Sequence, residues 1–204
     1  AKSRIGYKSV LHIVRMRPDG MGIFGDEVKI FDGNENGQIT IEGPKMYKRN
    51  GYYYIFAPAG GVKTGWQTIL RSKNPFGPYE YKVVLRQGDS LVNGPHQGAW
   101  VDTITGEDWF LHFQDVYAAG RITHLQPMHW ENDWPIIGVN KEGNDYGEPV
   151  MQYVKPNIGK TAEEFKDTDK YPVCEPDTTD EFDTDKMMLQ WQWNSNYDDS
   201  WYVT

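Results

Sequence analysis

The stretch KMYKRNGYYYIFAP, residues 45–58, carries the strongest fold signal in the chain. Two β-prone runs flank Asn50-Gly51, and Asn-Gly between such runs is typical of a tight hairpin turn. The second run is apolar on both faces, as in a strand that packs between two layers. The sequence therefore predicts an antiparallel hairpin, with strands at 45–49 and 52–58, inside an all-β domain.

The same pattern recurs further along the chain. The runs GAWVDT (98–103) and WFLHFQD (109–115) flank the turn ITGED (104–108), which places Gly106 at an interval of 55 residues from Gly51. Four short antiparallel strands in a repeat of this length are typical of a β-propeller blade, although two β-sandwiches would also give short strands. Further strands are expected at 8–16, 27–31, 66–72, 79–85 and 121–130.

Composition supports an all-β protein with a neutral ligand. The 204 residues include 8 Trp, 13 Tyr and 21 Gly, and aromatic residues favour strands. The net charge of −8 argues against a nucleic-acid partner, and a sugar fits an acidic, aromatic-rich chain better. No apolar run approaches the ~18 residues that a membrane span needs, so no membrane partner is expected. The single Cys174 excludes an intrachain disulfide, and the oligomeric state stays open.

Three segments are expected from the patterns along the chain. Residues 1–139 carry the propeller pattern, and residues 140–178 are interpreted as a linker or surface-wrapping arm with one short helix at 161–166. Ten acidic residues lie between Glu163 and Asp185. A new β pattern, MMLQWQWN (187–194), indicates that residues 179–204 begin a second domain. Both ends of the chain are abrupt, which suggests a piece of a longer protein.

Glu42 is the first catalytic candidate. Cleavage of a glycoside needs two carboxyl groups, one of which is held as an acid by a poorly hydrated environment. Glu42 lies between Ile41 and Gly43-Pro44, just before the aromatic run 52–56, so burial there would suit an acid. The alternative is an ordinary solvated loop residue before a hairpin.

Four motifs in order resemble glycoside hydrolase family 43. They are IEGPKMYKRNGYYYIFAPAGG (41–61), RSKNPFGPYE (71–80), NGPHQGAWVDTITGEDWFLHFQD (93–115) and GRITHLQPMHWENDWPIIG (120–138). The resemblance implies a five-bladed β-propeller that hydrolyses arabinosides or xylosides with inversion. The stretch TTDEFDTDKMMLQWQWN (178–194) is similar to the start of the C-terminal β-sandwich of the xylosidase and arabinofuranosidase branch.

The resemblance also implies roles for individual residues. In the family, the Glu of the EGP motif is the general acid, which is Glu42 here. His96 matches a histidine near the propeller axis, where some members hold calcium through water, although NGPHQG has one extra residue. Arg121 matches an arginine that reaches the active site. No cofactor is required for catalysis, and a structural calcium is possible.

One departure from the family concerns the base. The family's general base and a second, pKa-tuning Asp precede the EGP motif, the second usually by more than 50 residues, whereas 41 residues precede Glu42. Asp19, Asp26 and Asp32 fall in turns or loops and match neither motif. The chain is therefore expected to lack the first blade, part of the second and the catalytic base.

For several other side chains the sequence allows two different roles. Trp66 and Trp100 are candidates for stacking on a sugar ring, and packing between blades is the alternative for both. His112 and His124 either line the cavity or have ordinary strand roles. Nothing in the sequence prefers Gln67 or Gln97 over other amides as ligands of sugar hydroxyls.

The sequence thus predicts a partial five-bladed β-propeller followed by the start of a β-sandwich. The intact protein is expected to be an exo-acting inverting glycosidase on plant polysaccharides such as arabinoxylan, with α-L-arabinofuranosidase preferred and β-xylosidase close behind. A secreted or periplasmic location follows from such a substrate. The alternatives are a non-catalytic carbohydrate-binding propeller and, more generally, an interaction scaffold.

Overall fold

A computed structural model describes residues 8–159, 179–185, 190–191 and 198–201. The chain divides into two compact units, residues 1–159 and 160–204. The expected helix at 161–166 and most of the strand expected at 187–194 lie outside the described residues. The β-sandwich and the expected domain boundaries therefore stay predictions.

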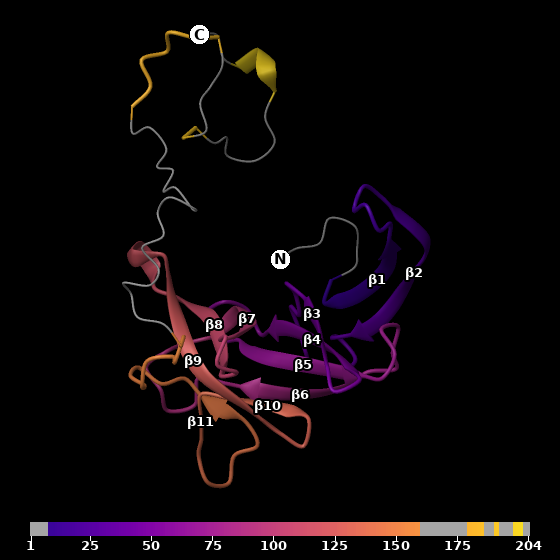
Figure 1. Ribbon diagram of the computed structural model, residues 1–204, viewed down its shortest axis with the longest axis vertical. Helices are drawn as coiled ribbons and strands as arrows, with labels where there is room; N and C mark the ends of the chain where they lie inside the picture. The colour runs from indigo at the N-terminus through magenta and orange to yellow at the C-terminus, as the bar shows by residue number, and fades with distance from the viewer. Residues whose placement is uncertain (1–7, 160–178, 186–189, 192–197, 202–204) are drawn as a thin grey trace. The chain divides into compact units, whose positions relative to one another are not determined.

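The described part of unit 1 is built from strands. Its helical content is a single 3-10 turn, Tyr117–Ala119. Two four-stranded antiparallel meanders follow each other along the chain (Figure 1). The first, here the first blade, consists of β3 (Lys45–Arg49), β4 (Tyr52–Ala59), β5 (Trp66–Ser72) and β6 (Glu80–Leu85). The second blade consists of β7 (His96–Asp102), β8 (Asp108–Asp115), β9 (Arg121–Glu131) and β10 (Trp134–Ile137).

Two smaller features flank the blades. β1 (Val10–Met16) and β2 (Ile23–Asp32) form a separate two-stranded sheet that precedes the first blade. β11 (Val139–Asn140) and β12 (Gly147–Glu148) lie at the outer edge of the first blade, where β12 runs parallel to β6. The short β11 and β12 were not expected in the sequence, because two-residue strands leave no periodic pattern.

The hairpin signal at Asn50-Gly51 is confirmed. Both residues have positive φ, 49° and 75°, and Arg49 pairs with Tyr52 across the turn. This is the backbone of a type I′ turn. A second turn of this kind joins β9 to β10 at Asn132 and Asp133, whose φ values are 52° and 58°. The sequence did not predict β10, because an Asn-Asp pair is a weaker turn signal than Asn-Gly.

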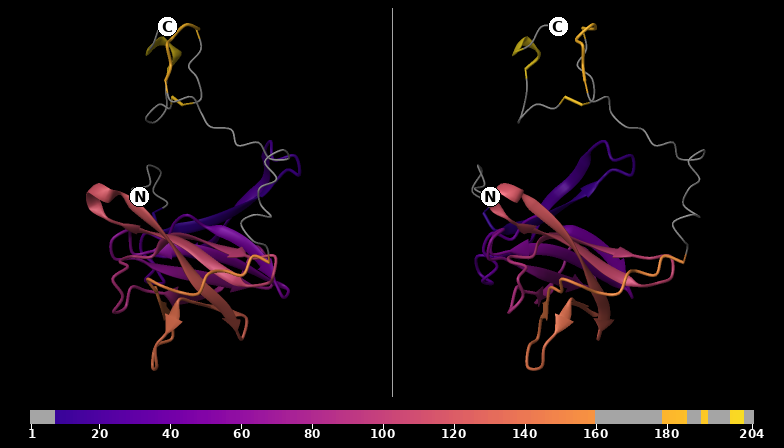
Figure 2. Two further views of the ribbon diagram at one scale, coloured as in Figure 1. Left: turned by 60° about the vertical axis from the view of Figure 1, so that its left-hand side comes forward. Right: turned by 90° about the vertical axis from the view of Figure 1, so that its left-hand side faces the viewer.

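Strand β4 is apolar on both faces because it has a core on each side. Tyr54 and Phe56 belong to the core between the two blades, together with Phe110 and Met128. Ile55, Ala57 and Ala59 point the other way, into the core with Leu11 and Phe31 of the β1–β2 sheet. Figures 1 and 2 follow the chain from the β1–β2 sheet through the first blade to the second. Stacked sheets of this kind confirm the expected blade arrangement.

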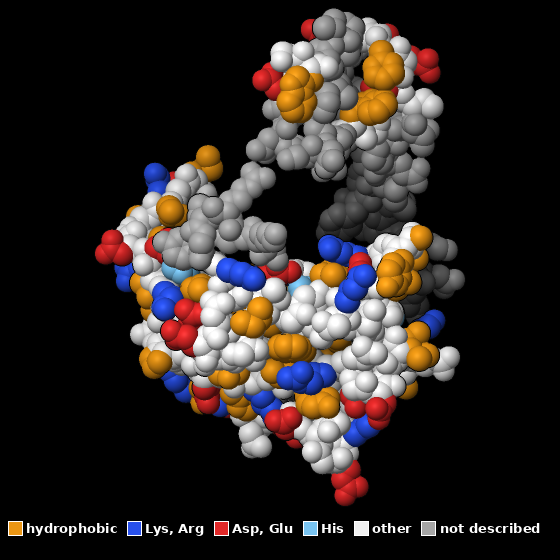
Figure 3. Space-filling model, turned by 180° about the vertical axis from the view of Figure 1, so that it is seen from behind, with side chains coloured by type: hydrophobic (Ala, Val, Ile, Leu, Met, Phe, Trp, Pro, Cys, Tyr) orange, Lys and Arg blue, Asp and Glu red, His pale blue; other side chains and the backbone are white. Residues whose placement is uncertain are grey.

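The surface of the described residues carries charges of both signs. On the face shown in Figure 3, Lys and Arg side chains are interspersed with Asp and Glu side chains. Within the described part of the chain, no helix has the length and apolar character of a membrane span.

Candidate active site

Glu42 lies in the loop between β2 and β3, and main-chain hydrogen bonds fix this loop. The N–H of Glu42 donates to the carbonyl of Pro58 at 3.0 Å, and the N–H of Gly60 donates to the carbonyl of Ile39 at 2.8 Å. Ile41, beside Glu42, is buried in the core between the β1–β2 sheet and the first blade. The loop therefore holds the Glu42 backbone beside the end of β4.

The carboxylate of Glu42 meets two residues from the start of β7. The Gln97 amide donates a hydrogen bond from Nε2 to Glu42 Oε1 at 3.1 Å. The Nδ1 atom of His96 lies 3.8 Å from the same oxygen. The Glu42 side chain is 29% exposed, whereas the His96 side chain is fully buried. Glu42 is thus half-buried, beside a fully buried histidine.

His96 is held in its neutral form. Burial lowers the pKa of His96, the positive charge of Arg121 lowers it further, and the Glu42 carboxylate opposes both effects. Neither ring nitrogen has a hydrogen-bond partner among the described residues. Two free, buried ring nitrogens next to a carboxylate are able to receive a polar ligand or water.

Arg121 reaches the same place from the start of β9. Its guanidinium lies 4.7 Å from the centre of the Phe113 ring, and that ring lies 5.8 Å from the His96 ring. Phe113 pairs with His96 across β7 and β8. Phe113 was not a sequence candidate, because only the strand register shows that it lies between a predicted histidine and a predicted arginine.

The structure does not bring Trp100 to this group. Its ring packs against Tyr47 at 5.2 Å and against Trp130 at 5.1 Å, both measured between ring centroids. Its indole N–H donates to Asp108 Oδ1 at 2.6 Å. These contacts support packing between blades for Trp100, rather than stacking on a sugar ring.

Trp66 follows a glycine that lies against His96, but its own side chain makes packing contacts. Its indole N–H donates to Gln38 Oε1 at 2.8 Å, and the Arg86 guanidinium lies 4.7 Å from its ring centre. It packs against the core shared with the β1–β2 sheet. The preceding Gly65 contacts the His96 ring so closely that an added Cβ would lie 3.0 Å from Cδ2. The loop that carries Trp66 thus borders the site, while the indole itself contributes to packing.

His112 and His124 form a stacked pair outside this group. Their rings lie 5.5 Å apart at 18°, and burial lowers the pKa of His112 to about 4. His112 Nε2 accepts from the Gln126 amide at 3.2 Å. Gln126 Oε1 in turn accepts from the N–H of Val150 at 2.7 Å. Of the two roles considered for His112, its burial and contacts support an ordinary role inside the fold.

The described residues do not form a calcium cage. No group of three His, Cys, Asp or Glu side chains in the described ranges is arranged to hold a metal ion. Calcium prefers six to eight oxygen ligands, and His96 supplies only nitrogen. Its unpartnered ring nitrogens are compatible with a bound water, so contact between His96 and calcium through water stays a prediction.

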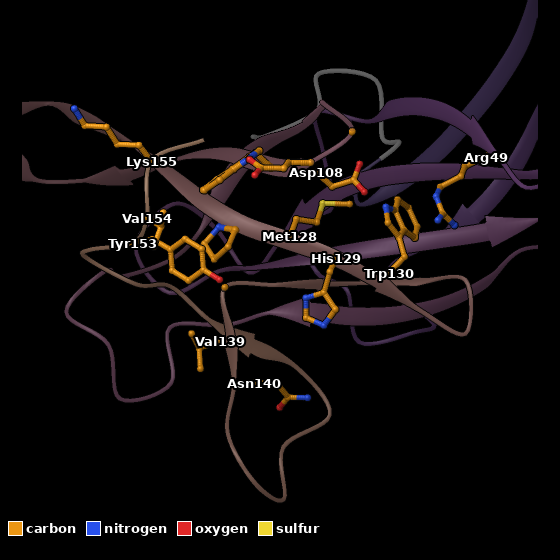
Figure 4. A pocket seen from close by; sticks show the side chains of 15 residues that line it. Arg49, Asp108, Met128, His129, Trp130, Val139, Asn140, Tyr153, Val154 and Lys155 are labelled. Carbon is orange, nitrogen blue, oxygen red and sulfur yellow. The ribbon is translucent and has the colours of Figure 1, made fainter. Parts of the chain in front are cut away.

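A hollow of about 730 Å³ opens elsewhere on unit 1, around the β7–β8 turn (Figure 4). Arg49, Trp130 and Tyr153 are among the side chains that line it, and Glu42, His96 and Arg121 are not. Arg121 and Trp130 lie near opposite ends of β9, about 30 Å apart at 3.3 Å per residue. The hollow is therefore distinct from the Glu42 group.

A half-buried carboxyl group beside a neutral imidazole suits the transfer of a proton to a neutral ligand. A family model described as glycosyl hydrolases family 43 matches residues 2–135. The chain belongs to this family. The resemblance seen in the four motifs is thereby confirmed.

The family 43 relatives include proteins named for two sugars. A putative beta-xylosidase of Xylanibacter ruminicola is 44% identical over 193 residues, which are 93% of this chain and 34% of the relative. A beta-xylosidase of Formosa agariphila is 34% identical, over 90% of this chain and 32% of the relative. A non-reducing end alpha-L-arabinofuranosidase of Bacteroides ovatus is 31% identical, over 78% of this chain and 30% of the relative. The chain spans about a third of the length of these relatives.

Solved family 43 structures share the fold. A bifunctional protein of Bacteroides eggerthii superposes with a TM-score of 0.59 at 28% identity, over 71% of this chain and 18% of that one. An enzyme engineered for endo-xylanase and exo-arabinofuranosidase activity superposes with a TM-score of 0.58 at 28% identity. The match covers 76% of this chain and 30% of that one. These neighbours are five-bladed β-propeller enzymes, and unit 1 of this chain is part of such a propeller.

Proposed function

We propose that the protein containing this chain is an exo-acting, inverting glycoside hydrolase with Glu42 as its general acid. Its substrates would be plant polysaccharides such as arabinoxylan, from which it releases terminal xylosyl or arabinofuranosyl residues. The observation that carries the proposal is the half-buried Glu42 carboxylate, hydrogen-bonded by Gln97 and beside buried His96, in a family 43 chain.

The chemistry is a single displacement at the anomeric carbon. Water adds to that carbon while the bond from carbon to the glycosidic oxygen breaks, and the Glu42 proton passes to the departing oxygen. A base takes a proton from the attacking water, so the free sugar has inverted configuration. We propose that this base is an Asp outside the present chain, ~6.5–9.5 Å from the Glu42 carboxyl in the complete site.

Arg121 and His96 are proposed to bind the sugar. Arg121 brings a positive charge and several N–H donors next to His96, and both types of side chain bind hydroxyl groups. The packing contacts of Trp66 and Trp100 do not support a stacking role, so neither tryptophan is included. A structural calcium near His96 and a secreted or periplasmic location remain part of the proposal on the strength of the family alone.

Xylose is the first sugar to test. The relatives at 44% and 34% identity carry the name beta-xylosidase, and the arabinofuranosidase relative is 31% identical. These names support xylosyl over arabinofuranosyl, which reverses the preference drawn from the sequence. Rates of the whole protein on an aryl β-xyloside and an aryl α-L-arabinofuranoside would rank the two.

The decisive variant is Glu42→Gln, which keeps the shape of the side chain and removes the acidic proton. Loss of a general acid costs typically 10²–10⁴-fold in rate, so we expect a loss of about that size on xylobiose. A dinitrophenyl xyloside needs little protonation of its leaving group and should lose less than about tenfold. Glu131→Gln is a matched control, because the Glu131 side chain is 62% exposed and lies on β9.

Equal loss of rate on both substrates would remove Glu42 as the acid. A protein that binds xylo-oligosaccharides in calorimetry but releases no pentose would be the carbohydrate-binding propeller. One that neither binds nor cleaves them would be the interaction scaffold.

A further inference from the structure

We infer that Phe113 positions the Arg121 guanidinium for binding of the sugar, because it presents the face of its ring to that cation. The inference rests on the proposed function, in which Arg121 binds the sugar. It adds a residue that acts through Arg121 without touching the substrate. Phe113 lies on β8 and Arg121 begins β9, so the two side chains meet through the pairing of these strands.

The first observation is the strand register. Asp115 pairs with Arg121 across β8 and β9. Phe113 lies two residues before Asp115, which makes it the diagonal neighbour of Arg121 on the same face. The Arg121 guanidinium lies 4.7 Å from the centre of the Phe113 ring. That distance is inside the ~6 Å over which a cation is attracted to an aromatic face.

The second observation is the choice of neighbour. Asp115 is directly opposite Arg121, and an ion pair between them would occupy N–H donors of the guanidinium. Among the residues that the structure describes, Arg121 forms neither an ion pair nor a side-chain hydrogen bond, and its guanidinium lies over the Phe113 ring. An aromatic face attracts the cation and leaves the N–H donors at its edge free. The guanidinium is thus held while its donors remain available to sugar hydroxyl groups.

The third observation is the place of the Phe113 ring in the site. Phe113 is the cross-strand partner of His96, and the two ring centres lie 5.8 Å apart. The His96 side chain is fully buried, so it gives Phe113 a fixed surface to pack against. Arg121, by contrast, is exposed and has a long side chain with many rotamers. A half-buried ring that contacts both side chains therefore restricts the exposed cation to positions near His96.

A purely structural role for Phe113 predicts a different result. If the ring only filled space beside His96, its removal would reduce activity whether or not Arg121 is present. A positioning role predicts that the loss disappears once Arg121 has been removed, because Phe113 then has no cation to hold. It also predicts that the loss appears in KM, since weaker binding of the sugar in the ground state and the transition state alike leaves kcat unchanged.

The test variant is Phe113→Leu in the whole protein, which keeps an apolar side chain and removes the aromatic face. We expect KM for a dinitrophenyl xyloside to rise by roughly 3-fold to 30-fold, and kcat to change by less than about 2-fold. The calorimetric affinity for xylose should fall by the same factor as KM rises. In the Arg121→Ala background, Phe113→Leu should change KM by less than about 2-fold.

Phe113→Tyr is the conservative variant, because it keeps the ring. It should hold KM within about 2-fold of the wild-type value. Urea unfolding reports whether each variant folds. Phe113→Met, which also lacks an aromatic face, carries the same expectations if Phe113→Leu does not fold.

Phe76→Leu is the matched control for the loss of a ring under a guanidinium. The Arg15 guanidinium lies 5.6 Å from the centre of the Phe76 ring, and Phe76 is half-buried, as Phe113 is. Phe76 belongs to the loop between β5 and β6 and contacts neither His96 nor Arg121. We expect Phe76→Leu to leave both KM and kcat unchanged.

The outcomes separate this inference from the proposed function. A wild-type protein that neither cleaves xylosides nor binds xylose would overturn both together. With an active wild type, an unchanged KM in Phe113→Leu would overturn the role of Phe113 alone, and so would a rise that persists in full in the Arg121→Ala background. A KM in Phe113→Tyr as high as that in Phe113→Leu would also overturn it, because the aromatic face would then not matter.

Discussion

Replacing His112 by Gln should remove much of the sensitivity of the fold to acid. The residue His112 is 2% exposed. Burial lowers its pKa from 6.5 to about 4; the backbone hydrogen bond with Phe113 opposes this, and the nearby His124 lowers it slightly further. The folded protein therefore keeps His112 neutral at a pH where the unfolded chain already binds a proton.

The size of the effect follows from these two pKa values. Because the folded pKa is the lower one, the stability due to neutral His112 is complete above about pH 6.5 and is lost as the pH falls toward 4. A difference of one pKa unit corresponds to about 1.4 kcal/mol. The free energy of unfolding therefore falls by at most about 3.4 kcal/mol as the pH decreases from above 6.5 to below 4. Between pH 7 and pH 5 the expected loss is about 2 kcal/mol.

The hydrogen bonds around the His112 ring explain why its protonation destabilises the folded protein. Neutral His112 accepts at Nε2 from the Gln126 amide, which also binds the N–H and the carbonyl of Val150. A protonated imidazole has no acceptor, so this contact would be lost and the amide would have to turn away from Val150. A Gln side chain at position 112 stays neutral at every pH in the window.

The assay is urea unfolding of the wild type, His112→Gln and His129→Gln at pH 7 and pH 5. His129→Gln is the matched control for the loss of an imidazole, because the His129 side chain is 59% exposed. We expect the wild type to lose about 2 kcal/mol more than His112→Gln between the two pH values. The same loss in both proteins, or an NMR titration that places His112 near 6.5 in the folded wild type, would refute the reasoning.

Two further changes test the packing between the blades. Gly98→Ala should lower the free energy of unfolding by about 1–3 kcal/mol, because an added Cβ would overlap the buried Phe110 ring; an unchanged urea midpoint would contradict this close fit. Tyr54→Phe should cost about 1–3 kcal/mol, because the buried Tyr54 hydroxyl donates to the carbonyl of Asp133 at 2.8 Å. Hydrogen exchange at the β9–β10 turn should then become faster in Tyr54→Phe, and protection equal to that of the wild type would show that this bond contributes little.

Elements with a strong local signal could be predicted from the sequence, and those with a weak one could not. The strands around Asn50-Gly51 were located almost to the residue, because turn chemistry and side-chain pattern agree there. β10 was missed because Asn132-Asp133 adopts its left-handed turn without a glycine. The early residues of β2 were missed because they are exposed and lack alternation.

The sequence by itself determined that this chain forms β-blades and that Glu42 is an acid candidate, since period, turn residues and motif are all local properties. The tertiary structure alone decided which side chains surround that acid. Gln97 reaches Glu42 through a bulge, and the strand register places Phe113 against His96. Trp100 packs against Trp130 instead. Such contacts join residues far apart in the chain, and they depend on how one blade packs against the next, which no local pattern encodes.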